Sequence, residues 1–315
     1  MLIYSIPLLA ISLLLIAALS DRVVGYVLVF SKVFGLSEMA AGFILLSLAT
    51  SLPELSVSTV AAVLGEGGLS VGNVLGSNIA NLTIIIGLAV FFSKTEILVK
   101  GQSQKELVQF LFLSSIIPLF IVQRGSLGPV LGIVLLVLFV YFNVTLSRKN
   151  GKNELIEHVN KMDTAIVGLK FLVGVGLIVV FSKFVVDSSV DIAGFIGLPT
   201  SIIGATIIGL GTSLPELATT IQALKKKLFD MALGNLLGSC ITNITLILGV
   251  SSLISFSPVN VVAVQSIMFY VLLSSLSVWY MVGTSERISK KGVLFLCIVY
   301  IMFILQQVGI SVLIF

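Results

Sequence analysis

Two stretches of this chain decide its fold: Thr50-Ser51-Leu52-Pro53-Glu54-Leu55 and Thr212-Ser213-Leu214-Pro215-Glu216-Leu217, which begin 162 residues apart. A second pair of stretches keeps the same spacing, because GNVLGSNIAN at 72–81 recurs as GNLLGSCITN at 234–243. Two matching blocks in one register indicate an internal duplication. We therefore expect the chain to consist of two related halves.

The composition identifies the environment of the chain. Of its 315 residues 57% are hydrophobic and 10% are charged, and the mean hydropathy is +1.19. Soluble domains carry about 45–50% apolar and about 25% charged residues. A soluble enzyme, a disordered chain and a nucleic-acid-binding module are excluded. The two cysteines, Cys240 and Cys297, lie in apolar runs and predict no disulfide framework.

Apolar runs predict the number of membrane spans, since a spanning helix needs about 20 mostly apolar residues. The sequence contains ten such runs: 2–31, 35–64, 69–93, 106–123, 127–147, 164–192, 197–224, 230–256, 259–281 and 292–314. We predict an all-α integral membrane protein of two five-helix repeats, at 1–147 and 164–315, joined by a linker at 148–163. Because five is odd, the second repeat is inverted relative to the first, as in many secondary transporters.

Positive charges predict the orientation of these spans. Fourteen of the 18 Lys and Arg residues fall on loops that share one face in the ten-span arrangement, whereas Arg124 and Lys183 fall on the other. Loops rich in Lys and Arg stay in the cytoplasm. We therefore expect a multi-pass protein of the cell membrane, with a cytoplasmic Arg148–Asp163 linker and both termini outside the cell.

Two acidic residues lie inside predicted spans, Glu54 in the second and Glu216 in the seventh. An ionisable residue at the centre of a bilayer costs about 2.5–3.5 kcal/mol and usually marks a functional site. Pairing with a buried base is disfavoured, because no Lys or Arg lies at comparable depth in a neighbouring block. The matched positions favour a role in transport.

Oxygen donors surround these acids. Pro53 and Pro215 have no N–H, so the carbonyl groups of Ala49 and Gly211 should be released from helical hydrogen bonding. Other donors stand one helical turn apart in matched pairs: Thr50 with Glu54, Thr212 with Glu216, Ser77 with Asn81, and Ser239 with Asn243. Hydrogen bonding between helices is the alternative role for these side chains. Carboxylate, amide, hydroxyl and carbonyl oxygens favour a hard cation such as Ca²⁺ or Na⁺.

The paired blocks resemble the α-repeats of the calcium/cation antiporter superfamily, which includes the sodium/calcium exchangers. The resemblance implies a transporter, and it implies that Glu54 and Glu216 bind Ca²⁺. An intramembrane enzyme is the alternative class and is disfavoured, because the matched glutamates are only loosely similar to an acid/base dyad; we expect no enzymatic activity and no cofactor. It further implies that the cation sites are completed by Thr50, Ser51, Ser77, Asn81, Thr212, Ser213, Ser239 and Asn243. From the proline positions we add the carbonyls of Ala49 and Gly211 as predicted cation ligands. The spans that begin near residues 2 and 164 would be long, tilted helices that slide to give alternating access.

Charge balance suggests the counter-ion. Asn243 stands where sodium/calcium exchangers commonly carry aspartate, which leaves two carboxylates. Two ionised glutamates balance one Ca²⁺, and two protons neutralise the same pair, whereas three Na⁺ would leave excess positive charge in a medium of low dielectric constant. We therefore predict Ca²⁺/H⁺ antiport in which Glu54 and Glu216 also carry the protons.

Other functions remain open at this point. Two Na⁺ per Ca²⁺ also satisfy the charge balance, so Na⁺/Ca²⁺ exchange is the alternative. A cation channel is less favoured because conduction does not explain two inverted halves. The expected partners are Ca²⁺, the counter-ion and membrane lipids, with no nucleic acid, and the sequence does not determine the oligomeric state.

Overall fold

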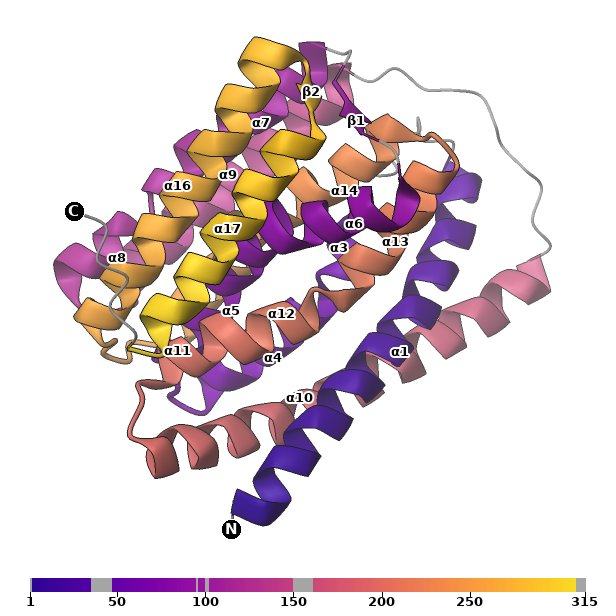
Figure 1. Cartoon of the computed structure of the whole chain (residues 1–315). Helices are drawn as coiled ribbons and strands as arrows, with labels where there is room; N and C mark the ends of the chain where they lie inside the picture. Colours follow the sequence, from indigo (N-terminus) through magenta and orange to yellow (C-terminus); the bar gives the residue numbers. More distant parts are fainter. Residues whose placement is uncertain (1, 35–46, 95, 100–101, 150–160, 310–315) are drawn as a thin grey trace.

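The computed structural model describes residues 2–34, 47–94, 96–99, 102–149 and 161–309, which are mainly helical (Figure 1). The first half contains α1 (Leu2–Phe34), α3 (Ser47–Thr50), α4 (Leu52–Val63), α5 (Gly67–Ala80), η2 (Asn81–Ile85), α6 (Ile86–Ser93), α7 (Gln102–Ile116), α8 (Leu119–Arg124) and α9 (Pro129–Lys149). The second half contains α10 (Lys161–Ile196), α11 (Thr200–Ile203), η3 (Gly204–Ile208), α12 (Gly209–Thr212), α13 (Leu214–Lys225), α14 (Phe229–Thr242), η4 (Asn243–Ile247), α15 (Leu248–Ile254), α16 (Val261–Ser285) and α17 (Lys290–Gln307). The η segments are π-helical.

The internal duplication extends from the sequence to the helices. Helices α4 and α13 begin and end 162 residues apart, and so do α5 and α14. The π-helical segments η2 and η4 keep the same spacing. Matched residues therefore form matched elements in the two halves.

Seven helical stretches within the described residues are long and apolar enough to cross a membrane: 67–93, 104–124, 166–196, 200–225, 229–254, 261–285 and 290–307. Three shorter apolar helices cover 4–20, 52–63 and 129–145. These stretches fall on the predicted runs, and they confirm a helical membrane protein. The count of ten spans stays a prediction, because residues 35–46 of the second predicted span lie outside the described residues.

Several helix ends differ from the predicted boundaries. Helix α10 covers 161–196 rather than 164–192 and ends where Gly197 adopts a left-handed conformation with φ of +71°. Helix α17 ends at Gln307 rather than at 314, and residues 310–315 lie outside the described residues. Much of the 148–163 linker also lies outside them, so its predicted position stays untested.

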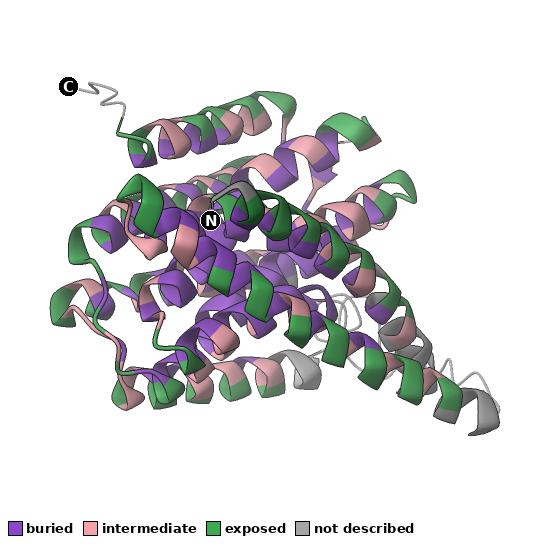
Figure 2. Cartoon of the chain, turned by 90° about the horizontal axis from the view of Figure 1, so that it is seen from below, coloured by how far each residue is buried: buried purple, intermediate pink, exposed green. Residues whose placement is uncertain are grey.

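Helices α1 and α10 cross each other at one side of the bundle and stand apart from its centre (Figure 1). Their outward faces are apolar and exposed, with Leu14 and Leu172 63% and 67% exposed. Figure 2 shows this pattern, with buried residues gathered centrally and exposed ones on the peripheral helices. Such apolar faces are suited to contact with lipid chains.

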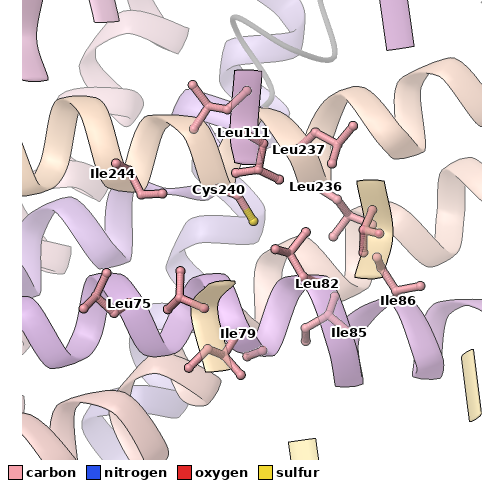
Figure 3. Packing of buried hydrophobic residues seen from close by; sticks show 14 of the residues in the cluster. Leu75, Ile79, Leu82, Ile85, Ile86, Leu111, Leu236, Leu237, Cys240 and Ile244 are labelled. Carbon is pink, nitrogen blue, oxygen red and sulfur yellow. The ribbon is translucent and has the colours of Figure 1, made fainter. Parts of the chain in front are cut away.

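The centre of the molecule is formed by α5 with η2 and by α14 with η4. In these two stretches 83% and 78% of the most apolar window is buried, compared with 28% in α10. Figure 3 shows Leu75, Ile79 and Leu82 close to Leu236 and Cys240 in this core. The repeated blocks therefore lie in the interior, where both halves meet.

Glycine allows this interior to pack backbone against backbone. A Cβ atom at Gly72 would lie 2.1 Å from the carbonyl oxygen of Ser201, and one at Gly76 would lie 2.1 Å from that of Ala205. No side chain fits such gaps, so the two glycines set the distance between α5 and the α11–η3 segment. This contact joins the first half to the second.

Two short strands interrupt the all-helical prediction. Strand β1 (Ile97–Leu98) pairs antiparallel with β2 (Arg287–Ile288), between loops of different halves. A bridge between Ser126 and Pro258 joins two other loops in a similar way. Strands of two residues are too short to show a period-2 pattern of apolar side chains, so they were not predicted.

Candidate functional site

Helix breaks place the two intramembrane acids. Ser51 separates α3 from α4, and Ser213 separates α12 from α13. Pro53 and Pro215 follow in the first turn of the new helices, where a missing N–H is tolerated. Each glutamate stands directly after its proline, at the start of a helix and in the interior of the protein.

The two glutamates are fully buried and are joined across the halves. Ser213 Oγ lies 3.1 Å from Glu54 Oε1 and 2.8 Å from the carbonyl oxygen of Gly209, two acceptors that share its one proton, and Ser51 Oγ donates to Glu216 Oε1 at 3.4 Å. Both glutamates have an exposed fraction of 0%. Each carboxylate therefore accepts a hydrogen bond from a serine of the opposite half. That serine lies three residues before the glutamate of its own half. The fold brings together the acids that the sequence placed 162 residues apart.

The predicted hydroxyl groups form matched contacts between the halves. Thr50 Oγ1 lies 3.2 Å from Ser239 Oγ, and Thr212 Oγ1 lies 3.4 Å from Ser77 Oγ. Ser77 Oγ also donates to the carbonyl oxygen of Gly209 at 3.1 Å. These four hydroxyl groups are buried and each pair contains one member from each half.

Sequence analysis missed Asn73, which contacts the site from α5. Its Nδ2 donates to the carbonyl oxygen of Glu54 at 3.3 Å and to Ser58 Oγ at 2.9 Å. Because a carbonyl oxygen only accepts, this contact fixes the amide orientation and turns Oδ1 toward Thr212, 3.2 Å away. The Thr212 proton is then held by Asn73 or by the carbonyl of Ile208, 3.0 Å away.

Asn235 has the matching role in the second half. Its Oδ1 accepts from Thr50 Oγ1 at 3.2 Å, while its Nδ2 donates to Thr219 Oγ1 at 2.9 Å. Thr219 donates its own proton to the carbonyl of Pro215, so it can only accept from Asn235. The hydroxyl groups of Thr50 and Thr212 thus donate their protons to protein acceptors. Their oxygen lone pairs remain available to accept from another group or to bind a cation.

A signal for these two asparagines was present in the sequence. Asn73 and Asn235 occupy the same place in the repeated 72–81 and 234–243 blocks, where a polar side chain stands among apolar ones. Like the two glutamates, they occur at matched positions in both repeats, and this duplication indicates a functional role. Their function as orienting groups, however, depends on contacts that only the tertiary structure provides.

Asn81 and Asn243 begin the π-helical segments η2 and η4. Such segments often occur at functional sites. Asn243 Nδ2 donates to Asn78 Oδ1 at 3.0 Å, and Asn78 Nδ2 donates to the carbonyl of Cys240, also at 3.0 Å. The halves differ here, because Cys240 replaces Asn78 at the matched position and cannot orient Asn81 in the same way.

Eleven buried side-chain oxygens have no hydrogen-bond partner among the described residues. Seven of them are hydroxyl oxygens, and the other four are carboxylate or amide oxygens: Glu54 Oε2, Glu216 Oε2, Asn81 Oδ1 and Asn243 Oδ1. A buried polar group without a partner costs about 1–3 kcal/mol, and native proteins contain few of them. These four belong to the predicted cation-binding residues of both halves. Carboxylate and amide oxygens are the donors that hard cations prefer.

The two predicted carbonyl donors lie at the helix breaks. Ala49 is buried in α3, and Gly211 in α12 lies against Leu13 of α1. Pro53 and Pro215 supply no N–H for these carbonyls. Their role as cation ligands stays a prediction, as does that of the side chains above.

The electrostatic setting contains few other charges. Within the part of the chain that the structure describes, no Lys or Arg forms an ion pair with either glutamate, and no cluster of three His, Cys, Asp or Glu residues occurs. Residues 68–72 match the G-x-S-x-G pattern of serine hydrolases, but Ser70 lies within α5 and not at a strand-to-helix turn. The site is therefore an oxygen-lined, acidic one.

Comparison with known proteins shows which protein family this chain is similar to. The family model described as sodium/calcium exchanger protein matches residues 4–148 and 167–309. The chain is 30% identical to the sodium/calcium exchanger MaX1 of Methanosarcina acetivorans, over 90% of this chain and 93% of the relative. It is 33% identical to the inner membrane protein YrbG of Escherichia coli, over 79% of each chain.

Solved structures show the same similarity. The sodium-calcium exchanger NCX_Mj soaked with 10 mM Na⁺ and no Ca²⁺ matches with a TM-score of 0.67 and 26% identity, over 99% of this chain and 100% of that chain. The same exchanger soaked with Na⁺ and 10 mM Sr²⁺ matches with a TM-score of 0.67 and 28% identity, over 96% and 98% of the two chains.

Proposed function

This chain belongs to the sodium/calcium exchanger family, and from that premise we propose that it moves Ca²⁺ across the membrane in exchange for Na⁺. The observation that carries this proposal is the pair of fully buried glutamates, each held by a serine of the opposite half and each with one unpartnered carboxylate oxygen. Such a pair matches the charge and oxygen chemistry of one Ca²⁺ ion.

Charge balance limits the number of cations that the site can bind. Two ionised glutamates in a medium of low dielectric constant need about two positive charges, which one Ca²⁺ or two Na⁺ supply. Asn243 adds an oxygen donor without adding a third negative charge. Binding of one Ca²⁺ or of two Na⁺ neutralises the site. Ca²⁺ and Na⁺ would therefore bind at this site in turn.

The fold supports alternating access. We propose that the ten predicted spans form two inverted repeats and that the site lies where they meet. Ser213 and Ser51 connect the glutamates across the repeats, so a movement of one repeat relative to the other changes both carboxylate environments together. Helices α1 and α10 lie at the periphery, and their close glycine contacts, Gly174 with Val23 and Gly211 with Leu13, are to side chains rather than to backbone as in α5.

Orientation follows from the distribution of positive charges. We propose that this cation antiporter lies in the cell membrane with both termini outside and the 148–163 linker in the cytoplasm. The membrane setting is supported by the family and by the apolar helices. The side on which each loop lies is supported by the Lys and Arg count alone.

Exchange of Ca²⁺ for H⁺ is the second candidate. The absence of a third carboxylate at Asn243 favours it, because two protons neutralise Glu54 and Glu216 with no surplus charge. The named relatives favour Na⁺ instead, since MaX1 and NCX_Mj are both described as sodium/calcium exchangers. We therefore place Na⁺ first and retain H⁺ as the alternative.

A flux measurement separates the two counter-ions. Purified protein in liposomes loaded with radioactive Ca²⁺ would be exposed either to an inward Na⁺ gradient at equal pH or to an inward H⁺ gradient without Na⁺. We expect Ca²⁺ efflux with the Na⁺ gradient that saturates with Na⁺ concentration. Efflux with the H⁺ gradient alone would reverse the order of the candidates, and efflux with no counter-ion would indicate a channel.

A further inference from the structure

A groove of about 780 Å³ runs between α6 and α17, on the lipid-facing side of the bundle. Gly87 and Cys297 line one end, and Lys94 and Lys290 line the other. Seven residues separate the two ends on each helix, or about 10 Å along the axis. We propose that this groove is a binding site for an anionic phospholipid, with its phosphate between the two lysines and an acyl chain along the groove.

A difference between the two halves explains why the groove exists. In the matched helix pair, α15 and α9, a Cβ at Gly132 would lie 2.8 Å from the carbonyl oxygen of Gly249, so these helices touch. The residue 162 positions after Gly132 is Leu294, whose side chain is 63% exposed in the groove wall. With leucine in place of glycine, α17 lacks this backbone contact, and its close approach to α6 lies instead at Gly87 and Cys297.

The wall of the groove suits an acyl chain. Phe91 and Phe92 of α6 are 72% and 54% exposed, and they line the groove opposite Leu294. The floor is formed where Gly87 meets Cys297, because a Cβ at Gly87 would lie 2.5 Å from Cys297 Sγ. The groove therefore offers an apolar channel that is closed at its deep end and charged at its outer end.

The charges at the outer end are available to a ligand. Lys105 donates to Glu286 at 2.6 Å and lowers the pKa of that carboxyl group, and Arg287 lies 3.7 Å from Glu96. Glu96 also accepts from the backbone N–H of Lys290 at 3.2 Å. The acids nearby are thus engaged, while the ammonium groups of Lys94 and Lys290 form no ion pair among the described residues.

Charge complementarity then selects the occupant. The positions that match Lys94 and Lys290 in the other half are Phe256 and Gly128, so the paired lysines belong to this groove and are not a repeated feature of the fold. Basic pockets between membrane helices bind anionic headgroups, and each Lys near the surface contributes about 1 kcal/mol. A zwitterionic lipid such as phosphatidylcholine also carries a phosphate, but its own choline ammonium balances that charge, so its attraction to the two lysines is weaker.

Lipid titration tests the proposal independently of the transported ions. Purified protein in detergent would be titrated with phosphatidylglycerol, phosphatidylcholine or soluble glycerol phosphate, and bound molecules would be counted by native mass spectrometry. We expect phosphatidylglycerol to bind more tightly than the other two. The Lys94→Gln/Lys290→Gln variant should weaken this binding roughly 30-fold, whereas the Lys225→Gln/Lys226→Gln control should leave it unchanged.

A thiol at the end of the groove provides a second measurement on the unchanged protein. Cys297 lines the groove, whereas Cys240 is fully buried in the core. Phosphatidylglycerol should slow alkylation of Cys297 by a membrane-permeant maleimide more than phosphatidylcholine does. Equal protection by both lipids, equal binding of both, or an equal loss in the control variant would overturn the proposal, and binding of glycerol phosphate alone would indicate an anion site without a lipid.

Discussion

Single oxygen atoms decide the chemistry of the central site. Glu54 and Glu216 each use one carboxylate oxygen for a serine of the other half and keep the second without a partner. An isolated buried charge is costly, and a bound cation offsets this cost. The site residues are therefore expected to oppose stability in the absence of a cation and to support it in the presence of one.

Replacing either glutamate by glutamine tests this expectation. Glu54→Gln and Glu216→Gln should each reduce Ca²⁺ flux at least about tenfold, because the loss of 1.4 kcal/mol of binding free energy already lowers affinity tenfold. The melting temperature without Ca²⁺ should stay the same or rise, while the rise on adding Ca²⁺ should disappear. Glu66→Gln, in the turn before α5, is the control that should keep both flux and the Ca²⁺ effect. Full flux in either site variant would remove that residue from the site.

Asn73 should act through Thr212. Asn73→Leu removes the acceptor for the Thr212 hydroxyl and leaves Ser58 without its donor, at a cost of about 1–3 kcal/mol in stability. We also expect a higher KM for Ca²⁺ than in the unchanged protein. Thr212→Val should raise the KM as well, whereas Thr212→Ser should not.

A double-mutant cycle separates this positioning role from a general loss of stability. If Asn73 orients the Thr212 hydroxyl, the effects of Asn73→Leu and Thr212→Val on KM are less than additive, with a coupling of about 0.5–3 kcal/mol. Additive effects on KM would show that the two side chains act separately.

Individual helices show how the site is held together. Helix α5 packs directly on the backbone of the α11–η3 segment through Gly72 and Gly76, and this contact carries Ser77 and Asn81 to the site. Breaks at Ser51 and Ser213 turn the glutamates inward at the start of new helices. The close packing of α5 and the breaks at Ser51 and Ser213 thus both position residues of the central site.

Adding one methyl group to α5 should separate these elements. Gly76→Ala would place a Cβ atom 2.1 Å from the carbonyl oxygen of Ala205, so one of the two backbones must move. We expect a loss of stability of about 1–3 kcal/mol, with reduced Ca²⁺ flux, measured by thermal unfolding and by transport. Gly176→Ala on α10 is the matched control, because nothing lies within 4 Å of its Cβ position. It should be neutral or stabilising by up to about 1 kcal/mol, and equal behaviour of the two variants would contradict this account of the packing.

The whole molecule is organised by the relation between its halves. The bounds of α4 and α13, and those of α5 and α14, repeat at a spacing of 162, and the hydrogen bonds at the site join one half to the other. The strand pair β1–β2 and the bridge between Ser126 and Pro258 also link loops of different halves. The halves therefore form one interdependent body around a shared site.

Matched cysteine positions test the inverted arrangement. Leu64 follows α4 and Lys226 follows α13, and these residues are exposed and 162 positions apart. In a chain with Cys240 and Cys297 replaced, an impermeant maleimide added to intact cells should label Leu64→Cys but not Lys226→Cys. Labelling of both from the same side would show that the halves are parallel and would remove the inverted repeat.

The sequence by itself determined the membrane setting, the two related halves and the pair of intramembrane acids. These follow from apolar length, from a repeat in one register and from the cost of burying charge, all of which can be read along the chain. The family followed from the same blocks. Thr50 and Thr212 were assigned to the site by their spacing from the glutamates, and Ser51 and Ser213 by resemblance, without any indication of their partners in the other half.

The tertiary structure decided which oxygens meet. The serine-to-glutamate bonds, the orientation of Asn73 and Asn235, and the difference between Asn81 and Asn243 all depend on contacts between residues far apart in the chain. The groove between α6 and α17 depends likewise on how closely two helices approach. The local sequence specifies which oxygen donors and which side-chain sizes are present. The distances between helices are set only when the two halves pack together.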